Sequence, residues 1–251
     1  MLVQISVSVR SDLQYSRSLE YVHKDTYAAY QATTSMGNYE VAAYVWALDL
    51  AARLFSRQSL DWEVLVKQYH SFRYLTPTTF KLIIHAPLQC AENYLQYPPK
   101  EGDPWDMRGS FLSAEDLELS SSLLMHVATW YTYALRLALL YDAPQAKQEA
   151  LLSAGTKFAA VLGETIIGIE WSFLALVVIL RRGAEPEVVD ARYKGLQKFI
   201  TCPDFEVRVK FIDALRSVLE RGLDAIPEVE RTIAAFDESK YYTLSGEYNA
   251  K

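Results

Sequence analysis

Apolar residues recur every three to four positions along most of this chain, which is the spacing of one face of an α-helix. The pattern follows Ser11, a residue type that commonly precedes the first turn of a helix. Pro87 is expected to kink or divide the helix in which it lies. The pattern predicts one helix that ends near Gly37, a second over 39–57, a third that begins after Ser59 and a fourth that begins at Thr76–Pro77. Further along the chain it predicts a helix over 114–141, one that ends at Gly163, one that ends at Arg182, and helices over 186–200, 203–221 and 227–236.

The two ends of the chain follow other patterns. Val3, Ile5, Val7 and Val9 alternate with polar neighbours, which is the period of a β-strand. Because no second convincing strand pattern offers a partner, we expect a short extended N-terminal segment, either a lone edge element or an arm. Residues 239–251 are polar and rich in tyrosine, and they predict a loosely held tail.

Eight to ten helices joined by short turns predict an all-α fold, a compact bundle of antiparallel helices. The small-residue rhythm over 134–159 is also typical of a helical hairpin repeat, but it does not recur at a fixed period, so a repeat scaffold stays a minority alternative. Residues 98–112 contain three prolines and two glycines and form the longest predicted loop. This loop separates an N-terminal helical half, 1–97, from a C-terminal helical half, 113–238, within what we expect to be one structural domain.

The most apolar stretch of the chain, residues 158–180, has to be compared with what a membrane-spanning helix requires. Glu164 and Glu170 interrupt it, and a carboxylate in hydrocarbon costs several kcal/mol. The uninterrupted part, from Trp171 to Leu180, is about half as long as a helix that spans a bilayer. We therefore predict a buried central helix and no contact with a membrane.

The balance of charges narrows the classes of partner. The chain has 25 Lys and Arg residues against 31 Asp and Glu, a net charge of −6, and neither half of the chain is basic. Binding to nucleic acid is disfavoured, because that class of partner requires a basic surface. An acidic surface steers cationic ligands and proteins, so a basic protein partner is expected.

Cysteine usage and the N-terminus indicate a cytoplasmic protein. Two cysteines, Cys90 and Cys202, cannot form a disulfide framework or a four-cysteine zinc site. The N-terminal residues lack the basic start, the apolar core and the cleavage site of a signal peptide. Cys202 precedes a predicted helix, a position that favours a reactive thiolate, but its neighbours Ile200 and Pro203 favour a packed capping position instead.

Sequence motifs for known chemistries are lacking. The chain has no HExxH motif, no close Cys/His cluster, no G-x-S-x-G elbow, no phosphate-binding loop and no G-x-G-x-x-G. Glu20 and His23 have the spacing of a helical metal-ligand pair, but a di-iron bundle needs that element twice. We therefore predict no metal, no cofactor and no catalytic residues.

The strongest functional lead is the acidic loop, which we expect to present an aromatic ring among carboxylates. Over residues 100–118 six acidic side chains face only two basic ones. A proline-bounded loop of this kind suits docking into a basic cleft, with the ring as anchor and the carboxylates as steering charge. The alternative is that acidic residues gather here only to stabilise the start of the next helix, for which Ser113 and Asp116 form a capping box. The predicted partner-binding residues are Glu101, Asp103, Trp105, Asp106 and Arg108.

A pocket between helices is the competing site. His126 and Glu170 lie in apolar predicted helices, and helical bundles place ligand sites between facing helices. The structural alternative for Glu170 is that it pairs with an arginine such as Arg136, because buried charges are normally matched.

Taken together, these features predict a non-enzymatic helical protein–protein interaction module. One specific version is an inhibitor or immunity-type protein that blocks the active site of a basic toxin or nuclease, with carboxylates in place of phosphates. The alternative is a helical enzyme or small-ligand-binding protein with a pocket between its helices. The identity of the partner and the oligomeric state stay open.

Overall fold

The computed structural model is all-α, as the apolar spacing predicts, and its described residues form ten α-helices and no strand. The predicted extended N-terminal segment and the predicted tail lie outside the described part of the chain. The structure describes residues 19–55, 61–74, 81–95, 102–113, 115–116 and 123–238.

The first two described helices form an antiparallel hairpin. Helix α2 (Leu19–Ser35) is followed by Gly37, whose φ of 70° reverses the chain at no steric cost, as the predicted end near this glycine requires. The side chain of Asn38 accepts a hydrogen bond from the backbone N–H of Val41 and starts α3 (Tyr39–Phe55). Eleven of the seventeen residues of α3 are buried, so α3 belongs to the core.

Helices α4 and α5 follow. Asp61 accepts a hydrogen bond from the N–H of Val64, at 3.1 Å, and caps α4 (Trp62–Phe72). Helix α5 (Lys81–Leu95) continues through Pro87, so this proline does not divide the helix. The predicted helix start at Thr76–Pro77 lies outside the described residues.

The predicted single helix over 114–141 is wrong. Residues 115–116 are helical, but Leu123 has a non-helical backbone, with φ −100° and ψ 85°, and α7 begins after it (Leu124–Leu140). Three consecutive serines precede Leu123, and serine side chains compete with the helix for backbone hydrogen bonds. Apolar periodicity continues across this break, which is why it did not reveal the interruption.

Two helices follow α7 along the chain. Helix α8 (Gln145–Ala159) leads through the short 3₁₀ helix η2 (Ala160–Leu162) to α9 (Ile166–Arg181). Fourteen residues of α9 are buried, which confirms the predicted buried central helix. No described helix combines the length and the apolar character needed to cross a membrane.

Up to residue 238, where the described part of the chain ends, three helices follow the left-handed turn at Gly183, whose φ is 72°. These are α10 (Pro186–Gln197), α11 (Pro203–Arg221) and α12 (Ile226–Glu238), with the short 3₁₀ helix η3 (Gly222–Ala225) before the last. Proline at the first position of α10 and of α11 loses no helical hydrogen bond, so the predicted starts at these prolines are correct.

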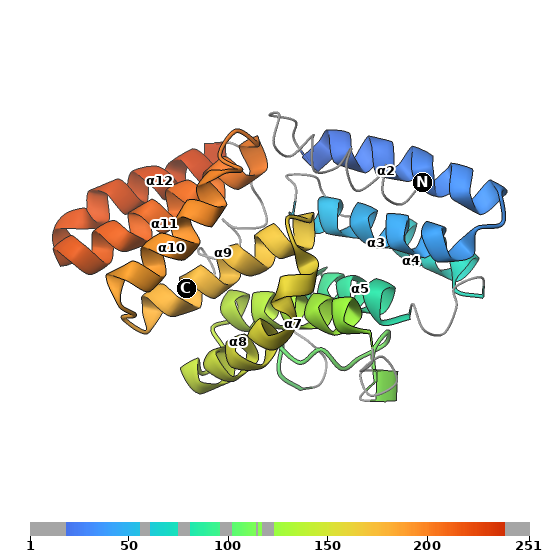
Figure 1. Cartoon of the computed structure of the whole chain (residues 1–251), viewed down its shortest axis with the longest axis horizontal. Helices are drawn as coiled ribbons and strands as arrows, with labels where there is room; N and C mark the ends of the chain where they lie inside the picture. The colour runs from blue at the N-terminus through green and yellow to red at the C-terminus, as the bar shows by residue number, and fades with distance from the viewer. Residues whose placement is uncertain are drawn as a thin grey trace.

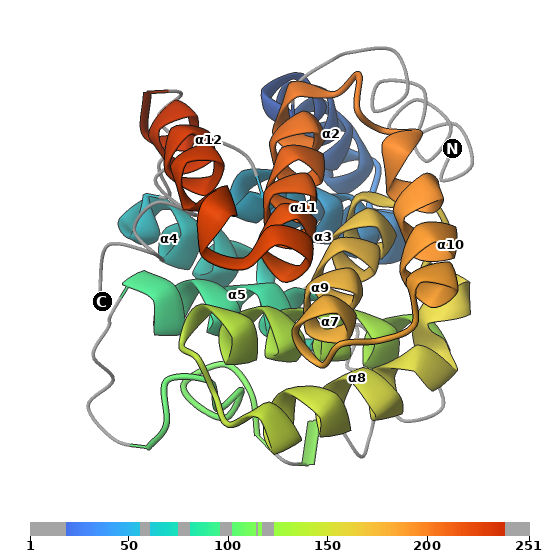
Figure 2. The same ribbon diagram turned by 90° about the vertical axis from the view of Figure 1, so that its left-hand side faces the viewer.

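Figure 1 shows α2 and α3 at one end of the molecule, α10 to α12 at the other end, and α9 between them. Helices α7 and α8 lie below α9 in that view, and Figure 2 shows α5 running beside α7. Helix α5 packs on both α3 and α7, and α9 packs on α3, α7, α8, α10 and α11. Helices from before and after the acidic loop therefore share one interior.

Candidate functional site: the loop pocket

The acidic loop is held against helix α5 by hydrogen bonds from a side chain of α5 to the backbone of the loop. The side-chain amide of Asn93 donates to the carbonyl oxygen of Pro104 at 3.1 Å and to that of Asp106 at 2.6 Å. The hydroxyl of Tyr141, at the end of α7, donates to the carbonyl oxygen of Asn93 at 2.8 Å. One asparagine therefore connects α5, the loop and the end of α7.

A second set of contacts holds the C-terminal part of the loop. The N–H of Phe111 donates to Oε1 of Gln89 at 3.0 Å, and the N–H of Ser110 donates to Oε2 of Glu92 at 3.3 Å. Gly109 lies so close to α5 that a Cβ atom at this position would be 2.3 Å from Nε2 of Gln89. The side-chain amide of Gln89 is itself held by Glu92 and Asn93, at 2.9 and 2.7 Å.

Together with helices α7 and α8, this loop lines an open pocket of about 440 Å³, which we call the loop pocket. Its apolar lining includes two tryptophans, one from the loop and one from α7. Its polar lining comes from the loop and from the first turn of α8. The lining residues are Asp103, Trp105, Asp106, Met107, Arg108, Ser113, Trp130, Ala134, Lys147 and Leu151.

Charges around the loop pocket are partly paired. Arg108 donates from Nε to both carboxylate oxygens of Asp106, at 3.0 and 2.9 Å, and its Nη2 forms a further contact. Hydrogen bonds from Arg108 hold the pKa of the Asp106 carboxyl below its ordinary value, and Lys147 adds a smaller effect of the same sign. The carboxylate of Asp103 and the ammonium of Lys147 form no ion pair within the described residues.

Four of the five predicted partner-binding residues therefore line one pocket; the fifth, Glu101, lies outside the described residues. Trp105 is mostly buried and packs against the hydrophobic core, whereas we expected a ring presented to solvent. Asp106 is neutralised within the loop by Arg108, so fewer carboxylates are available for steering than expected.

Sequence reasoning missed the partners of the loop on the helices. Trp130, Lys147 and Leu151 lie in α7 and α8, well after the loop in the chain, and no local motif connects them to it.

The predicted capping box is present: the hydroxyl and N–H of Ser113 donate to Asp116 at 3.0 and 2.9 Å, and the N–H of Asp116 donates back to the hydroxyl.

The second predicted site does not assemble as one pocket. Glu170 is fully buried between two arginines: Arg136 contacts its Oε1, and Nε of Arg208 donates to its Oε2 at 2.8 Å. The pairing of Glu170 with Arg136 is confirmed, and Arg208 is an additional partner. His126 is buried near the ring of Tyr44, ten residues before Arg136, which is about 15 Å along α7.

The charges around Glu170 connect five helices. Arg208 of α11 also donates to the backbone carbonyl of Phe55 in α3 at 3.1 Å. Asp204, four residues earlier, accepts a hydrogen bond of 2.7 Å from the N–H of Leu19 at the start of α2. Both carboxylates and both guanidinium groups are buried. This buried charge network therefore has a structural role and leaves Glu170 no open position for a ligand.

The loop also contacts an aromatic cluster on α4 and α5. The ring of Phe111 lies edge-on to Tyr69, with centroids 5.1 Å apart. The hydroxyl of Tyr69 lies 3.1 Å from Nε2 of His85, and burial lowers the pKa of His85 below 6.5. The loop is thus connected, through Phe111 and Tyr69, to a histidine whose pKa is lowered by burial.

Both cysteine side chains, Cys90 and Cys202, are buried. Cys202 precedes α11, as expected, but burial together with Asp204 raises its pKa to about 11. The thiol is therefore protonated at neutral pH, which supports the packed capping position over a reactive thiolate.

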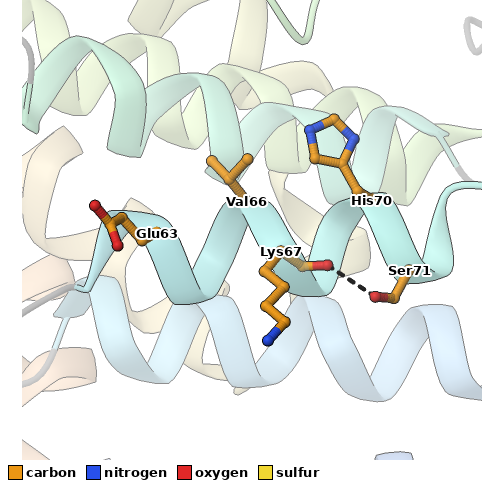
Figure 3. A pocket seen from close by; sticks show the side chains of 5 residues that line it. All are labelled: Glu63, Val66, Lys67, His70 and Ser71. Carbon is orange, nitrogen blue, oxygen red and sulfur yellow. Dashed lines mark hydrogen bonds between the residues drawn. The ribbon is translucent and has the colours of Figure 1, made fainter.

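A larger depression of about 600 Å³ lies along α4, and its five lining side chains all come from that helix. Figure 3 shows Val66 and His70 on one side of the helix and Lys67 on the other. The hydroxyl of Ser71 donates to the carbonyl oxygen of Lys67 at 2.9 Å. Because these polar groups do not converge, the loop pocket is the better candidate site.

Across the described ranges, no group of three or more His, Cys, Asp or Glu side chains is placed to hold a metal ion. Comparison of the chain with protein-family models, with curated proteins and with solved structures finds no match.

Proposed function

We propose that this protein is a non-enzymatic interaction module that binds a basic protein partner through the acidic loop and the loop pocket. The observation that supports the proposal is a loop bonded to α5 whose partly exposed tryptophan lines a pocket. The more specific form is an inhibitor or immunity-type protein that occludes the active site of a basic toxin or nuclease.

Preorganisation is the first support. Ordering a loop on binding costs free energy, and this loop is already ordered by Asn93, Gln89 and Glu92. A partner therefore binds a surface that is already ordered, and less of the free energy of binding is spent on ordering the loop.

The arrangement of apolar and polar groups is the second support. Tight protein interfaces centre on a buried aromatic anchor surrounded by polar groups that exclude water. Trp105 and Trp130, both mostly buried, line the pocket with the buried Leu151, while Asp103 and Lys147 are exposed.

Charge is the third support. After the Asp106–Arg108 pair is set aside, Asp103 in the loop and Glu115 and Asp116 in the helical turn that follows it keep this region acidic, in a chain of net charge −6. Acidic surfaces accelerate encounters with basic partners.

Cross-linking from the pocket rim tests the proposal. A photo-reactive amino acid replaces Lys147 at the rim, and in the control it replaces Lys157, which is exposed on the same helix but does not line the pocket. In cells that make the protein naturally, we expect one basic protein to be cross-linked from position 147 and not from 157.

The purified partner then gives the decisive measurement. Trp105→Ala is expected to weaken its affinity at least about tenfold in calorimetry, because interface tryptophans are frequent hot spots. For the inhibitor version, the partner's own activity is assayed with and without this protein. Identical products from positions 147 and 157, or unchanged affinity of a folded Trp105→Ala variant, contradict the proposal.

Small-ligand binding is a second candidate function, and the volume of the loop pocket favours it. Sites for small molecules typically have volumes of about 300–1,000 Å³, an apolar lining and a few polar groups, and the loop pocket has these features. Native mass spectrometry of gently purified protein tests this function. A bound compound that is lost in a Trp130→Ala variant is expected, and its retention in that variant contradicts binding in this pocket.

A further inference from the structure

We propose that the loop pocket binds a free α-amino acid with a large apolar side chain, with Asp103 facing the ammonium group and Lys147 the carboxylate. The inference rests on the second candidate function, small-ligand binding, and names the class of ligand.

The apolar lining requires an apolar body in the ligand. Trp105 and Trp130 supply broad ring surfaces, and Met107, Ala134 and Leu151 are each at most 6% exposed. Met107, Ala134 and Leu151 are already shielded from water by the protein, so an apolar group of a ligand would cover mainly the partly exposed tryptophan rings. An aromatic or branched aliphatic group suits this surface.

The exposed side chains of Asp103 and Lys147 offer charges of both signs to a ligand. Asp106 is satisfied by Arg108 through its side chain, so neither of its carboxylate oxygens needs a ligand. Asp103 and Lys147 form no ion pair within the described residues and lie on the same pocket. A carboxylate and an ammonium at one pocket complement a ligand that has one ammonium and one carboxylate.

The size of the pocket limits the ligand. A volume of about 440 Å³ lies in the lower part of the usual range for small-molecule sites. It suits one amino acid with its water molecules better than a dinucleotide or a haem.

Calorimetry with the complete protein at pH 7 tests the class of ligand. The probes are L-phenylalanine, which has both charges, phenethylamine, which has only the cation, and 3-phenylpropionate, which has only the anion. L-phenylalanine is expected to bind at least about tenfold more tightly than either of the others, because each loses one charge-assisted contact. The dipeptides glycyl-phenylalanine and phenylalanyl-glycine distinguish a free amino acid from the end of a peptide, and both are expected to bind more weakly.

Two variants test which residue faces the ammonium group of the ligand and which faces its carboxylate. Asp103→Asn is expected to weaken L-phenylalanine and phenethylamine about tenfold and to leave 3-phenylpropionate unchanged. Lys147→Met is expected to weaken L-phenylalanine and 3-phenylpropionate and to leave phenethylamine unchanged. Asp224→Asn and Lys157→Met, at exposed positions away from the pocket, are the matched controls and should bind like the wild type.

Binding of the three probes to the wild-type protein tests the inference even if a variant fails to fold. No saturable binding of L-phenylalanine up to 10 mM, or equal binding of all three probes, overturns the inference. So does a dipeptide that binds more tightly than the free amino acid. If native mass spectrometry still finds another compound in the pocket, the small-ligand function survives and only the class of ligand is wrong.

Discussion

At the scale of single residues, the loop depends on the close approach of Gly109 to the side-chain amide of Gln89. Gly109 approaches the amide of Gln89 so closely that any side chain requires this amide to move. The amide is buried and bonded to Phe111, Glu92 and Asn93, so moving it breaks several hydrogen bonds at once.

Gly109→Ala is therefore expected to lower the free energy of unfolding by about 1–3 kcal/mol, the cost of unsatisfied buried groups, measured by urea unfolding. Faster hydrogen exchange at the N–H of Phe111 should accompany it. The matched control is Gly195→Ala, in α10, where a Cβ atom meets nothing within 4 Å. The control should stabilise the protein by up to about 1 kcal/mol, because alanine is the better helix former. A stabilising Gly109→Ala contradicts this account of the loop.

His85 makes stability depend on pH. Burial, the largest cause, and Lys81 lower its pKa in the folded protein below 6.5, and Asp116 opposes them. The unfolded chain therefore takes up the proton first, so the stability contributed by the neutral ring is complete above about pH 6.5. That contribution declines as the pH falls from there towards the lower, folded-state pKa.

We expect the free energy of unfolding to fall less between pH 7 and pH 5 in His85→Gln than in the wild type. Urea unfolding at each pH measures this difference. Ser71→Ala, at an exposed position of α4 and without loss of a titratable group, is the comparison and should keep the slope of the wild type. A His85→Gln variant with the wild-type slope shows that another group titrates.

At the scale of elements, the buried charge network holds the helices together at one point. Glu170 of α9 lies between Arg136 of α7 and Arg208 of α11. The removal of the central carboxylate leaves two buried guanidinium groups without their common partner, which costs far more than the loss of a surface pair.

Glu170→Gln is expected to lower the free energy of unfolding by about 3–5 kcal/mol, as broken buried pairs do, in denaturant titration followed by circular dichroism. Glu187→Gln, exposed in the first turn of α10, should change it by less than about 1 kcal/mol. A loss below about 1 kcal/mol for Glu170→Gln means that the network contributes little.

At the scale of the whole molecule, helices from both halves of the sequence share the same interior. Helix α2 is tied to α11 by Leu19 and Asp204, and α3 is tied to it by Phe55 and Arg208. Bonds of this kind couple the two halves energetically, although the acidic loop lies between them in the chain.

The described helices are therefore expected to unfold in one cooperative transition. Far-ultraviolet circular dichroism, which reports all helices, should coincide with tryptophan fluorescence, to which buried Trp46 in α3 and buried Trp171 in α9 contribute. Two separated transitions, or different midpoints for the two probes, would show that the halves fold independently.

The amino-acid sequence by itself determined the helices and several of their ends. Apolar spacing specified the all-α class, and Gly37, Asn38, Gly183 and the prolines of α10 and α11 marked their boundaries, because turn and cap geometry depends on local residue chemistry. The pairing of Glu170 with an arginine also followed from a general rule, since a buried charge needs a partner.

Only the tertiary structure decided what the acidic loop forms. Trp130 and Lys147 reach the pocket from α7 and α8, and Asn93 holds the loop from α5, through contacts between residues far apart in the chain. Local patterns carry no information about which helix faces meet, because that choice minimises exposed apolar surface and unpaired polar groups over the whole molecule at once. The same packing turned Trp105 from an expected solvent-facing anchor into one wall of a pocket.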